Sequence, residues 1–157
     1  MSENGATEHE NAIELVAFRI RKQEYCVNIM SVREIRGWTR ETVLPLAPDY
    51  VRGVINLRGS VVPIVDLSGR LGLEPVEPCA RHVIIITQIE NQLVGLVVDA
   101  VSDILTITSD SIQPTPDVSS DSVREFVEGV LAMEDRMINL LDLSSILPTD
   151  AVEGIAA

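Results

Sequence analysis

The chain has 157 residues, of which 46% are hydrophobic but only 3% aromatic, and its formal net charge is −12. This size and composition fit one domain, or two small interdependent ones, around an aliphatic core. The negative charge argues against nucleic acid or an anionic membrane surface as a partner, and no apolar run reaches the length of a membrane span. Cys26 and Cys79 show no metal-ligand spacing, so we expect two reduced thiols in a cytoplasmic protein.

The first predicted elements are a tail and two strands. Residues 1–13 are polar, acidic and without periodicity, which indicates a disordered tail. Residues 14–21 alternate between two sets of side chains, and this pattern predicts a half-buried strand. A turn at residues 23–24 leads into a second predicted strand over residues 25–29.

A short helix is predicted next, over Ser31–Arg36. Ser31 is the candidate N-cap, and Glu34 occupies the position of the acid in a capping box. Val32 and Ile35 are three residues apart and would share one face of this helix. We therefore expect Ile35 to point into the core and Glu34 to point outward.

A β-hairpin is the clearest local prediction. Two runs rich in β-branched residues, 54–57 and 60–65, are separated by Arg58-Gly59. Glycine accepts the positive φ of a tight turn, and branched side chains suit a pleated surface. Pro63 has no N–H, which indicates that the second strand is an edge strand or is bulged there. Arg58 is thereby placed at an exposed apex.

The rest of the chain is predicted to be strands and short turns. Asp66 and Asp142 are candidate N-caps of single helical turns, and Pro75 and Pro78 mark a linker over residues 72–82. The other predicted elements are strands at 42–46, 83–90, 93–98 and 104–108, a polar segment at 109–121, a second hairpin within 126–141, and a frayed end at 148–157.

The chain contains an internal repeat. Residues 51–68 align with 127–144 without a gap, and residues 15–35 align with 84–104 in the same order. Two matching blocks in one order favour a duplication over chance similarity, so we predict repeat one at about residues 14–71 and repeat two at about residues 83–147.

The two repeats differ in charge. Residues 1–82 carry ten Lys and Arg against eleven Asp and Glu, whereas residues 83–157 carry two against thirteen. The hairpin apex shows the same difference, with Arg58-Gly59 in repeat one and Glu134-Asp135 in repeat two. Two similar scaffolds with different surfaces suggest two different partners.

No catalytic or cofactor-binding constellation is evident. His82 opens a predicted strand and has no evident nucleophile partner, and Asp66 and Asp142 are explained as caps. The glycines near the first hairpin are not followed by the helix that a phosphate-binding loop requires. No cluster has the spacing of metal ligands. A small all-β protein without an assembled site is typical of a binding module with no catalytic residue, metal or cofactor.

Three segments resemble the CheW family of chemotaxis coupling proteins. They are Val32–Gly37, Arg52–Leu67 and Gly95–Leu105. The resemblance covers residues 14–147 and implies two five-stranded SH3-like β-barrels that share a hydrophobic core, with a few short helices. It also implies an adaptor without enzymatic activity, which links the cytoplasmic tip of methyl-accepting chemotaxis receptors to the histidine kinase CheA.

The resemblance also implies a receptor-binding site. Carried over residue by residue, the family's receptor contacts fall on Val32, Glu34, Gly53, Arg58 and Val83. A receptor tip built as a helical hairpin is expected to bind in a groove that has an apolar strip flanked by charges. The contacts with CheA cannot be assigned to single residues.

Other functions remain open at this point. The chain could be the double-barrel module of a larger signalling protein, such as a kinase regulatory domain. It could be a barrel that binds oligonucleotides, although its charge and its few aromatics argue against that. A hydrolase requires Asp66 or Asp99 to lie in a pocket with a raised pKa.

Overall fold

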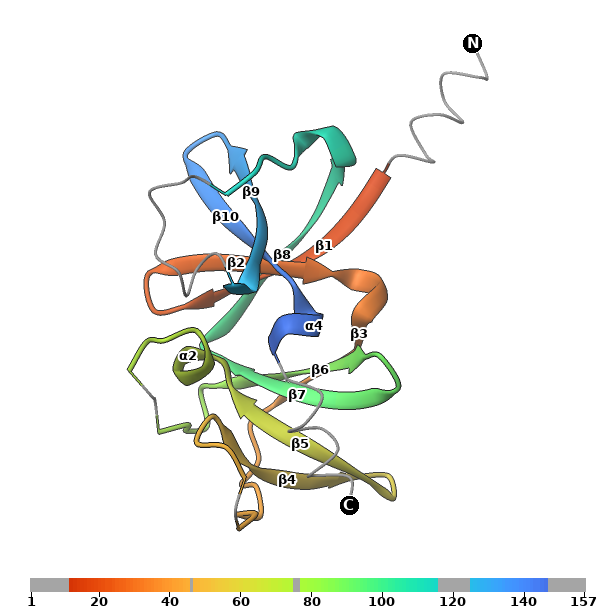
Figure 1. Ribbon diagram of the computed structural model, residues 1–157, viewed down its shortest axis with the longest axis vertical. Helices are drawn as coiled ribbons and strands as arrows, with labels where there is room; N and C mark the ends of the chain where they lie inside the picture. Colours follow the sequence, from red (N-terminus) through yellow and green to blue (C-terminus); the bar gives the residue numbers. More distant parts are fainter. Residues whose placement is uncertain (1–11, 46, 75–76, 116–124, 147–157) are drawn as a thin grey trace.

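The computed structural model describes residues 12–45, 47–74, 77–115 and 125–146, and within them two five-stranded sheets form two barrels (Figure 1). The strands are β1 (Ala12–Ile20), β2 (Gln23–Asn28), β3 (Val32–Gly37), β4 (Val51–Leu57), β5 (Ser60–Asp66), β6 (Val83–Ile89), β7 (Gln92–Val98), β8 (Ala100–Thr108), β9 (Val127–Met133) and β10 (Arg136–Leu141). The short helices are η1 (Ile29–Ser31), α2 (Leu67–Arg70), η2 (Ser109–Ser111) and α4 (Leu143–Ile146). The predicted all-β fold of two SH3-like barrels is confirmed.

The predicted chain ends fall largely outside this description. Of the expected tail, only residues 12 and 13 are described, and they already belong to β1. The expected frayed end at residues 148–157 lies wholly outside the described residues. None of the helices in the described ranges has the length and apolarity to cross a membrane.

Each barrel combines strands from both predicted repeats. The first barrel has the order β8-β1-β2-β10-β9, and the second barrel has the order β3-β6-β7-β5-β4. The first two strands of each repeat therefore lie in the barrel that holds the last three strands of the other. The exchanged hairpins join their new partners through parallel pairs, β2 with β10 and β7 with β5, whereas the other neighbours are antiparallel.

The exchange buries both faces of the exchanged strands. Along β1, Val16 and Phe18 pack in a core that both barrels share, while Leu15 and Ala17 pack inside the first barrel. The prediction of a half-buried β1 was therefore wrong, because Leu15, Val16, Ala17 and Phe18 are each at most 1% exposed. Strands buried on both faces read as apolar runs, as β6 does with Ile84, Ile85 and Ile86.

The shared core holds the two barrels together. It contains side chains from β1 and β2 of the first barrel and from β5, β6 and β7 of the second. Two smaller apolar clusters fill the barrel interiors, and Leu131 and Ile138 belong to the first, Ile64 and Ile84 to the second. Because the largest cluster lies between the barrels, neither barrel has an independent core of comparable size.

The predicted helix at Ser31–Arg36 is wrong. Asn28 caps the 3-10 turn η1 by accepting a bond from the Met30 N–H at 2.9 Å, and the chain then enters strand β3. Pairing with β6 supplies the backbone partners that a helix would have supplied internally, and β-branched Val32 and Ile35 suit a strand. Ile35 is 45% exposed and Glu34 is half-buried, which is the reverse of the expected orientation.

The first hairpin forms as predicted. Arg58 and Gly59 are its two turn residues, with φ of 51° and 90°, and the Asn56 side chain accepts a bond from the Gly59 N–H at 2.8 Å. The prediction for Pro63 was wrong in part, because β5 is an interior strand of its sheet. Its parallel pairing with β7 begins only at Ile64, so Pro63 lies just before the shared ladder.

An additional segment lies against β4 and makes Gly53 necessary. Thr42 and Val54 exchange two backbone hydrogen bonds of 2.8 Å, as an isolated bridge in place of the predicted strand at 42–46. A Cβ on Gly53 would lie 2.2 Å from the Thr42 carbonyl oxygen. The second repeat contains the same bridge between Gln113 and Val130, so the duplication extends to this segment.

The short helices α2 and α4 lie between the barrels (Figure 1). Asp66 occupies the predicted N-cap position of α2, and the Asp142 carboxylate accepts bonds from the Ser144 backbone and hydroxyl before α4. Arg70 of α2 has its guanidinium 4.4 Å from the Tyr50 ring centre and 4.6 Å from that of Phe126. Arg70 also donates to backbone carbonyls of α4, so one side chain joins the ends of both repeats.

Candidate functional site

An exposed ion pair between Arg58 and Glu34 connects the two outer strands of the second barrel. The Arg58 guanidinium donates to the Glu34 carboxylate at 2.5 Å, although the two residues are 24 positions apart. Glu34 lies on β3 and Arg58 on the turn after β4, and β3 and β4 are the two outer strands in the order of this sheet. The pair therefore bridges the two edges that the barrel brings together.

The charges of this pair are unequally exposed. The Arg58 side chain is 73% exposed and that of Glu34 is 29% exposed. The hydrogen bond from Arg58 lowers the pKa of Glu34, with smaller charge effects from Arg58 and from Arg36, whose guanidinium lies 3.9 Å away. Glu34 thus remains a carboxylate that orients Arg58, while most of the guanidinium faces solvent, where a partner carboxylate could reach it.

Gly53, another residue of the predicted site, is buried in β4. It has no side chain with which to contact a partner, and its neighbour is the Thr42 backbone. The structure therefore explains Gly53 by the close approach of two backbone segments. A side chain at this position would push away the segment over residues 38–42, which lies against β4.

Val32 and Val83 lie at opposite ends of the paired strands β3 and β6. Val32 pairs with Thr87, whereas Val83 pairs with Gly37. Both valines are half-buried and pack against the shared core. Of the five predicted site residues, the structure thus brings only Glu34 and Arg58 into direct contact.

Sequence reasoning missed part of this surface. Ile35 is exposed beside Glu34, Val61 of β5 is 65% exposed three residues after Arg58, and Arg36 joins the ion pair. The strand alternation of residues 32–37 was the available signal, because it places Ile35 on the outer face once the helix is rejected. Other large apolar side chains that are more than half exposed are Met30, Val43, Ile104 and Met137.

The charge difference between the repeats is concentrated at equivalent backbone positions. Arg21 and Glu90 are the positive-φ residues of the equivalent β1–β2 and β6–β7 turns, and Arg58 and Glu134 are those of the equivalent β4–β5 and β9–β10 turns, with φ between 51° and 57°. Arg52 occupies the register shift of β4 and β5, and Glu128 occupies that of β9 and β10. The sequence indicated only one of these reversals, the one between Arg58 and Glu134.

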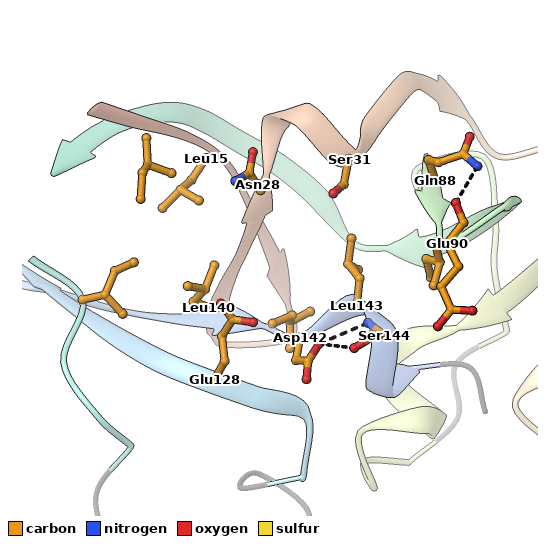
Figure 2. A pocket seen from close by; sticks show the side chains of 14 residues that line it. Leu15, Asn28, Ser31, Gln88, Glu90, Glu128, Leu140, Asp142, Leu143 and Ser144 are labelled. Carbon is orange, nitrogen blue, oxygen red and sulfur yellow. Dashed lines mark hydrogen bonds between the residues drawn. The ribbon is translucent and has the colours of Figure 1, made fainter. Parts of the chain in front are cut away.

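A cavity of about 310 Å³ opens between the barrels (Figure 2). Figure 2 shows Leu15 and Asn28 on one side and Leu140 and Asp142 on the other, with Glu128 nearby. Burial, and then the charge of Asp142, raise the pKa of Glu128. Among the described residues that line this cavity there is no His, Lys or Cys, and the Ser144 hydroxyl donates to the Asp142 carboxylate at 2.6 Å.

His82 has neighbours that the sequence did not indicate. Its Nδ1 lies 3.5 Å from the Cys79 Sγ, and its Nε2 lies 3.6 Å from the Asp99 carboxylate. The predicted absence of a nucleophile beside His82 was therefore wrong. Among the described residues, no three His, Cys, Asp or Glu side chains gather in a way that could hold a metal ion.

Comparisons with known proteins agree on one family. A family model described as "CheW-like domain" matches residues 14–151. "Chemotaxis protein CheW" of Rhizobium meliloti (strain 1021) is 61% identical over 141 residues, which cover 90% of this chain and 91% of the relative. "Chemotaxis protein CheW" of Klebsiella aerogenes is 35% identical over 137 residues, which cover 87% and 82%.

A solved structure has the same fold. The crystal structure of the scaffolding protein TtCheW from Thermoanaerobacter tengcongensis matches with a TM-score of 0.80 and 33% sequence identity. The match covers 88% of this chain and 94% of that one. The likeness therefore extends over most of both chains.

Proposed function

Because the chain belongs to the CheW-like family and is a non-enzymatic chemotaxis adaptor, we propose that it couples methyl-accepting chemotaxis receptors to the histidine kinase CheA. Because the chain is an adaptor, we no longer consider the hydrolase and oligonucleotide-binding functions that the sequence left open. Its coupling partners belong to the chemotaxis signalling array. The receptor tip is cytoplasmic, so the proposed place of action is the cytoplasm.

The observation that carries the receptor proposal is the exposed Arg58 held by Glu34. The proposed receptor surface consists of Val32, Glu34, Gly53, Arg58 and Val83. Arg58 would anchor a carboxylate of the receptor hairpin, and Glu34 would hold the guanidinium in place. Gly53 would act through the backbone it shapes, because it is buried.

The apolar part of this surface fits a helical partner. Ile35 is 45% exposed on β3, where Glu34 and Arg36 are its sequence neighbours, whereas the half-buried Val32 packs against the shared core. An apolar strip flanked by charges is what helix-in-groove recognition requires. The equivalent turns of the two repeats carry opposite charges, so they would suit different partners. We therefore place the kinase on a surface other than the one around Arg58.

The proposal is tested by reconstitution with a receptor cytoplasmic fragment and CheA. Co-sedimentation of a receptor fragment on vesicles measures binding, and transfer of radiolabelled phosphate measures kinase activity. We expect this protein to bind the fragment and to raise CheA autophosphorylation only when the receptor is present. Normal binding without any rise in kinase activity would contradict coupling, and absence of binding would contradict the receptor surface.

A further inference from the structure

A turn between the two repeats places a thiol, an imidazole and a carboxylate in one line. The Cys79 N–H donates to His82 Nδ1 at 3.0 Å, and the Cys79 Sγ lies 3.5 Å from the same nitrogen. On the far side of the ring, Nε2 faces the Asp99 carboxylate at 3.6 Å. His82 is buried, whereas Cys79 is only half-buried, so the imidazole is fixed and the sulfur remains accessible.

Backbone contacts from two other parts of the chain hold these three residues in place. The Trp38 N–H donates to the His82 carbonyl at 3.1 Å, which ties the turn to the end of β3. The Asp99 N–H donates to the Arg19 carbonyl at 3.0 Å, and Asp99 accepts a bond from the Arg21 N–H at 2.6 Å. Because Nδ1 accepts the Cys79 N–H, neutral His82 carries its proton on Nε2, toward Asp99. The unprotonated nitrogen therefore faces the thiol.

The surroundings favour the thiolate. Hydrogen bonds from the Arg81 backbone and side chain, with a smaller contribution from the nearby His82 ring, lower the pKa of the Cys79 thiol to about 7. The other charged groups that face this site line the neighbouring cavity of about 330 Å³, and they are Arg21, Glu77 and Asp99. The second cysteine has the opposite environment, because burial, and then the charge of Glu128, raise the pKa of Cys26 to about 12.

We propose that Cys79 is a nucleophilic thiol, activated by His82 and Arg81, and that it is a site of oxidation by small hydroperoxides. The thiol loses its proton to solvent, and the thiolate sulfur attacks one oxygen of hydrogen peroxide. A sulfur–oxygen bond forms as the oxygen–oxygen bond breaks, and the leaving hydroxide takes a proton from solvent and departs as water. The sulfur is oxidised by two electrons to a sulfenic acid, and the peroxide is reduced.

The expected gain in reactivity is moderate. At pH 7 a thiol with a pKa of about 7 is roughly half thiolate, against roughly 1% for the ordinary cysteine pKa of 9.0. This difference gives an advantage of roughly 50-fold. A less basic thiolate is also a weaker nucleophile, which reduces the advantage roughly 8-fold over two pKa units. Cys79 should therefore react about 6-fold faster than an ordinary exposed thiol at pH 7.

The test measures alkylation of the folded full-length protein by iodoacetamide from about pH 5.5 to 9.5, followed by peptide mass spectrometry. We expect the rate at Cys79 to rise with an inflection near pH 7, and Cys26 to remain unlabelled while the protein is folded. Treatment with hydrogen peroxide and dimedone should then label Cys79, and Cys79→Ser should abolish that label. An inflection at about pH 8.5 or above, or a peroxide rate no faster than that of free cysteine, overturns the proposal.

Two variants test the activation itself. Arg81 is exposed, so Arg81→Gln should leave the fold intact and move the inflection upward. Arg33→Gln removes the same charge from an exposed residue of β3 and should leave the inflection in place. His82→Gln should also raise the inflection, and because His82 is buried its melting temperature is measured beside the parent's. Equal profiles for Arg81→Gln and Arg33→Gln overturn the activation by Arg81.

Discussion

Reversing the charge at residue 58 separates two roles that the ion pair with Glu34 can have. Arg58→Glu places two carboxylates where the guanidinium now donates to Glu34 at 2.5 Å. One role is to hold β3 against the hairpin turn, and the other is to present a cation to the receptor. The first concerns folding and the second concerns binding, so the two can be measured independently.

The effect on folding should be small. Arg58 is 73% exposed and has a positive φ that is kept in the variant, and an exposed pair is screened by salt and water. We expect the melting temperature to fall by no more than about 3 °C. The effect on binding should be large, because an arginine anchor at an interface often contributes about 2 kcal/mol, which corresponds to roughly 30-fold in Kd.

A charge swap provides the decisive comparison. Arg58→Glu combined with Glu34→Arg restores the attraction within the barrel but moves the cation from the turn to β3. If the ion pair matters only for folding, the double variant should couple receptor to kinase normally. If Arg58 contacts the receptor, the double variant should remain deficient although its melting temperature recovers.

Two further variants calibrate the measurement. Glu134→Arg changes charge at the equivalent turn of the second repeat, with a similar φ of 51°, and should affect receptor binding far less. Arg58→Lys keeps the charge but loses the planar fork, so it should bind with intermediate affinity. Receptor binding and kinase activation are measured for each protein beside its melting temperature. Normal coupling by Arg58→Glu would refute the reasoning and leave Arg58 as a solvated turn residue.

Three other predictions follow from the fold and the cavity. A fragment of residues 1–76 should not fold, and the full chain should show one calorimetric transition; two transitions would argue against a shared core. Gly53→Ala should destabilise by about 2 kcal/mol or more in denaturant titrations because its Cβ meets backbone, while Gly37→Ala, with open space around it, should be nearly neutral. The raised pKa of Glu128 means that ionisation weakens the fold as pH rises through that pKa, so Glu128→Gln should melt higher than the parent at pH 7 but not at pH 4.

The sequence predicted what depends on local geometry. Arg58-Gly59 was recognisable as a turn because glycine and two branched runs define a hairpin without reference to distant residues. The internal repeat likewise predicted two similar β-rich units, although the repeat boundaries at residues 14–71 and 83–147 remain predictions. Ser31–Arg36 failed because Ser31 and Glu34 satisfy a capping box locally, while the pairing partner that makes the segment a strand lies some 50 residues away in β6.

The arrangement of the candidate site could not be predicted in the same way. The contact between Glu34 and Arg58 depends on closure of the second barrel, which the periodicity of either strand does not contain. Leu15 and Val16 could not both be predicted as buried, because burial of the second face of β1 arises only when strands are exchanged. The Cys79–His82 pair is local, with two residues between its ends, but the fixed imidazole depends on Trp38 and Asp99.

The exchange of strands also sets an order for biosynthesis. The hairpin of β1 and β2 leaves the ribosome first, but its neighbours β8 and β10 lie much later in the chain, and the earlier of them, β8, begins only at Ala100. A two-stranded hairpin is marginally stable in water, so its two apolar faces must wait unpaired while the intervening residues are made. We therefore expect the nascent chain to depend on chaperones that shield β-branched segments, and to reach its native state only after β10 has emerged.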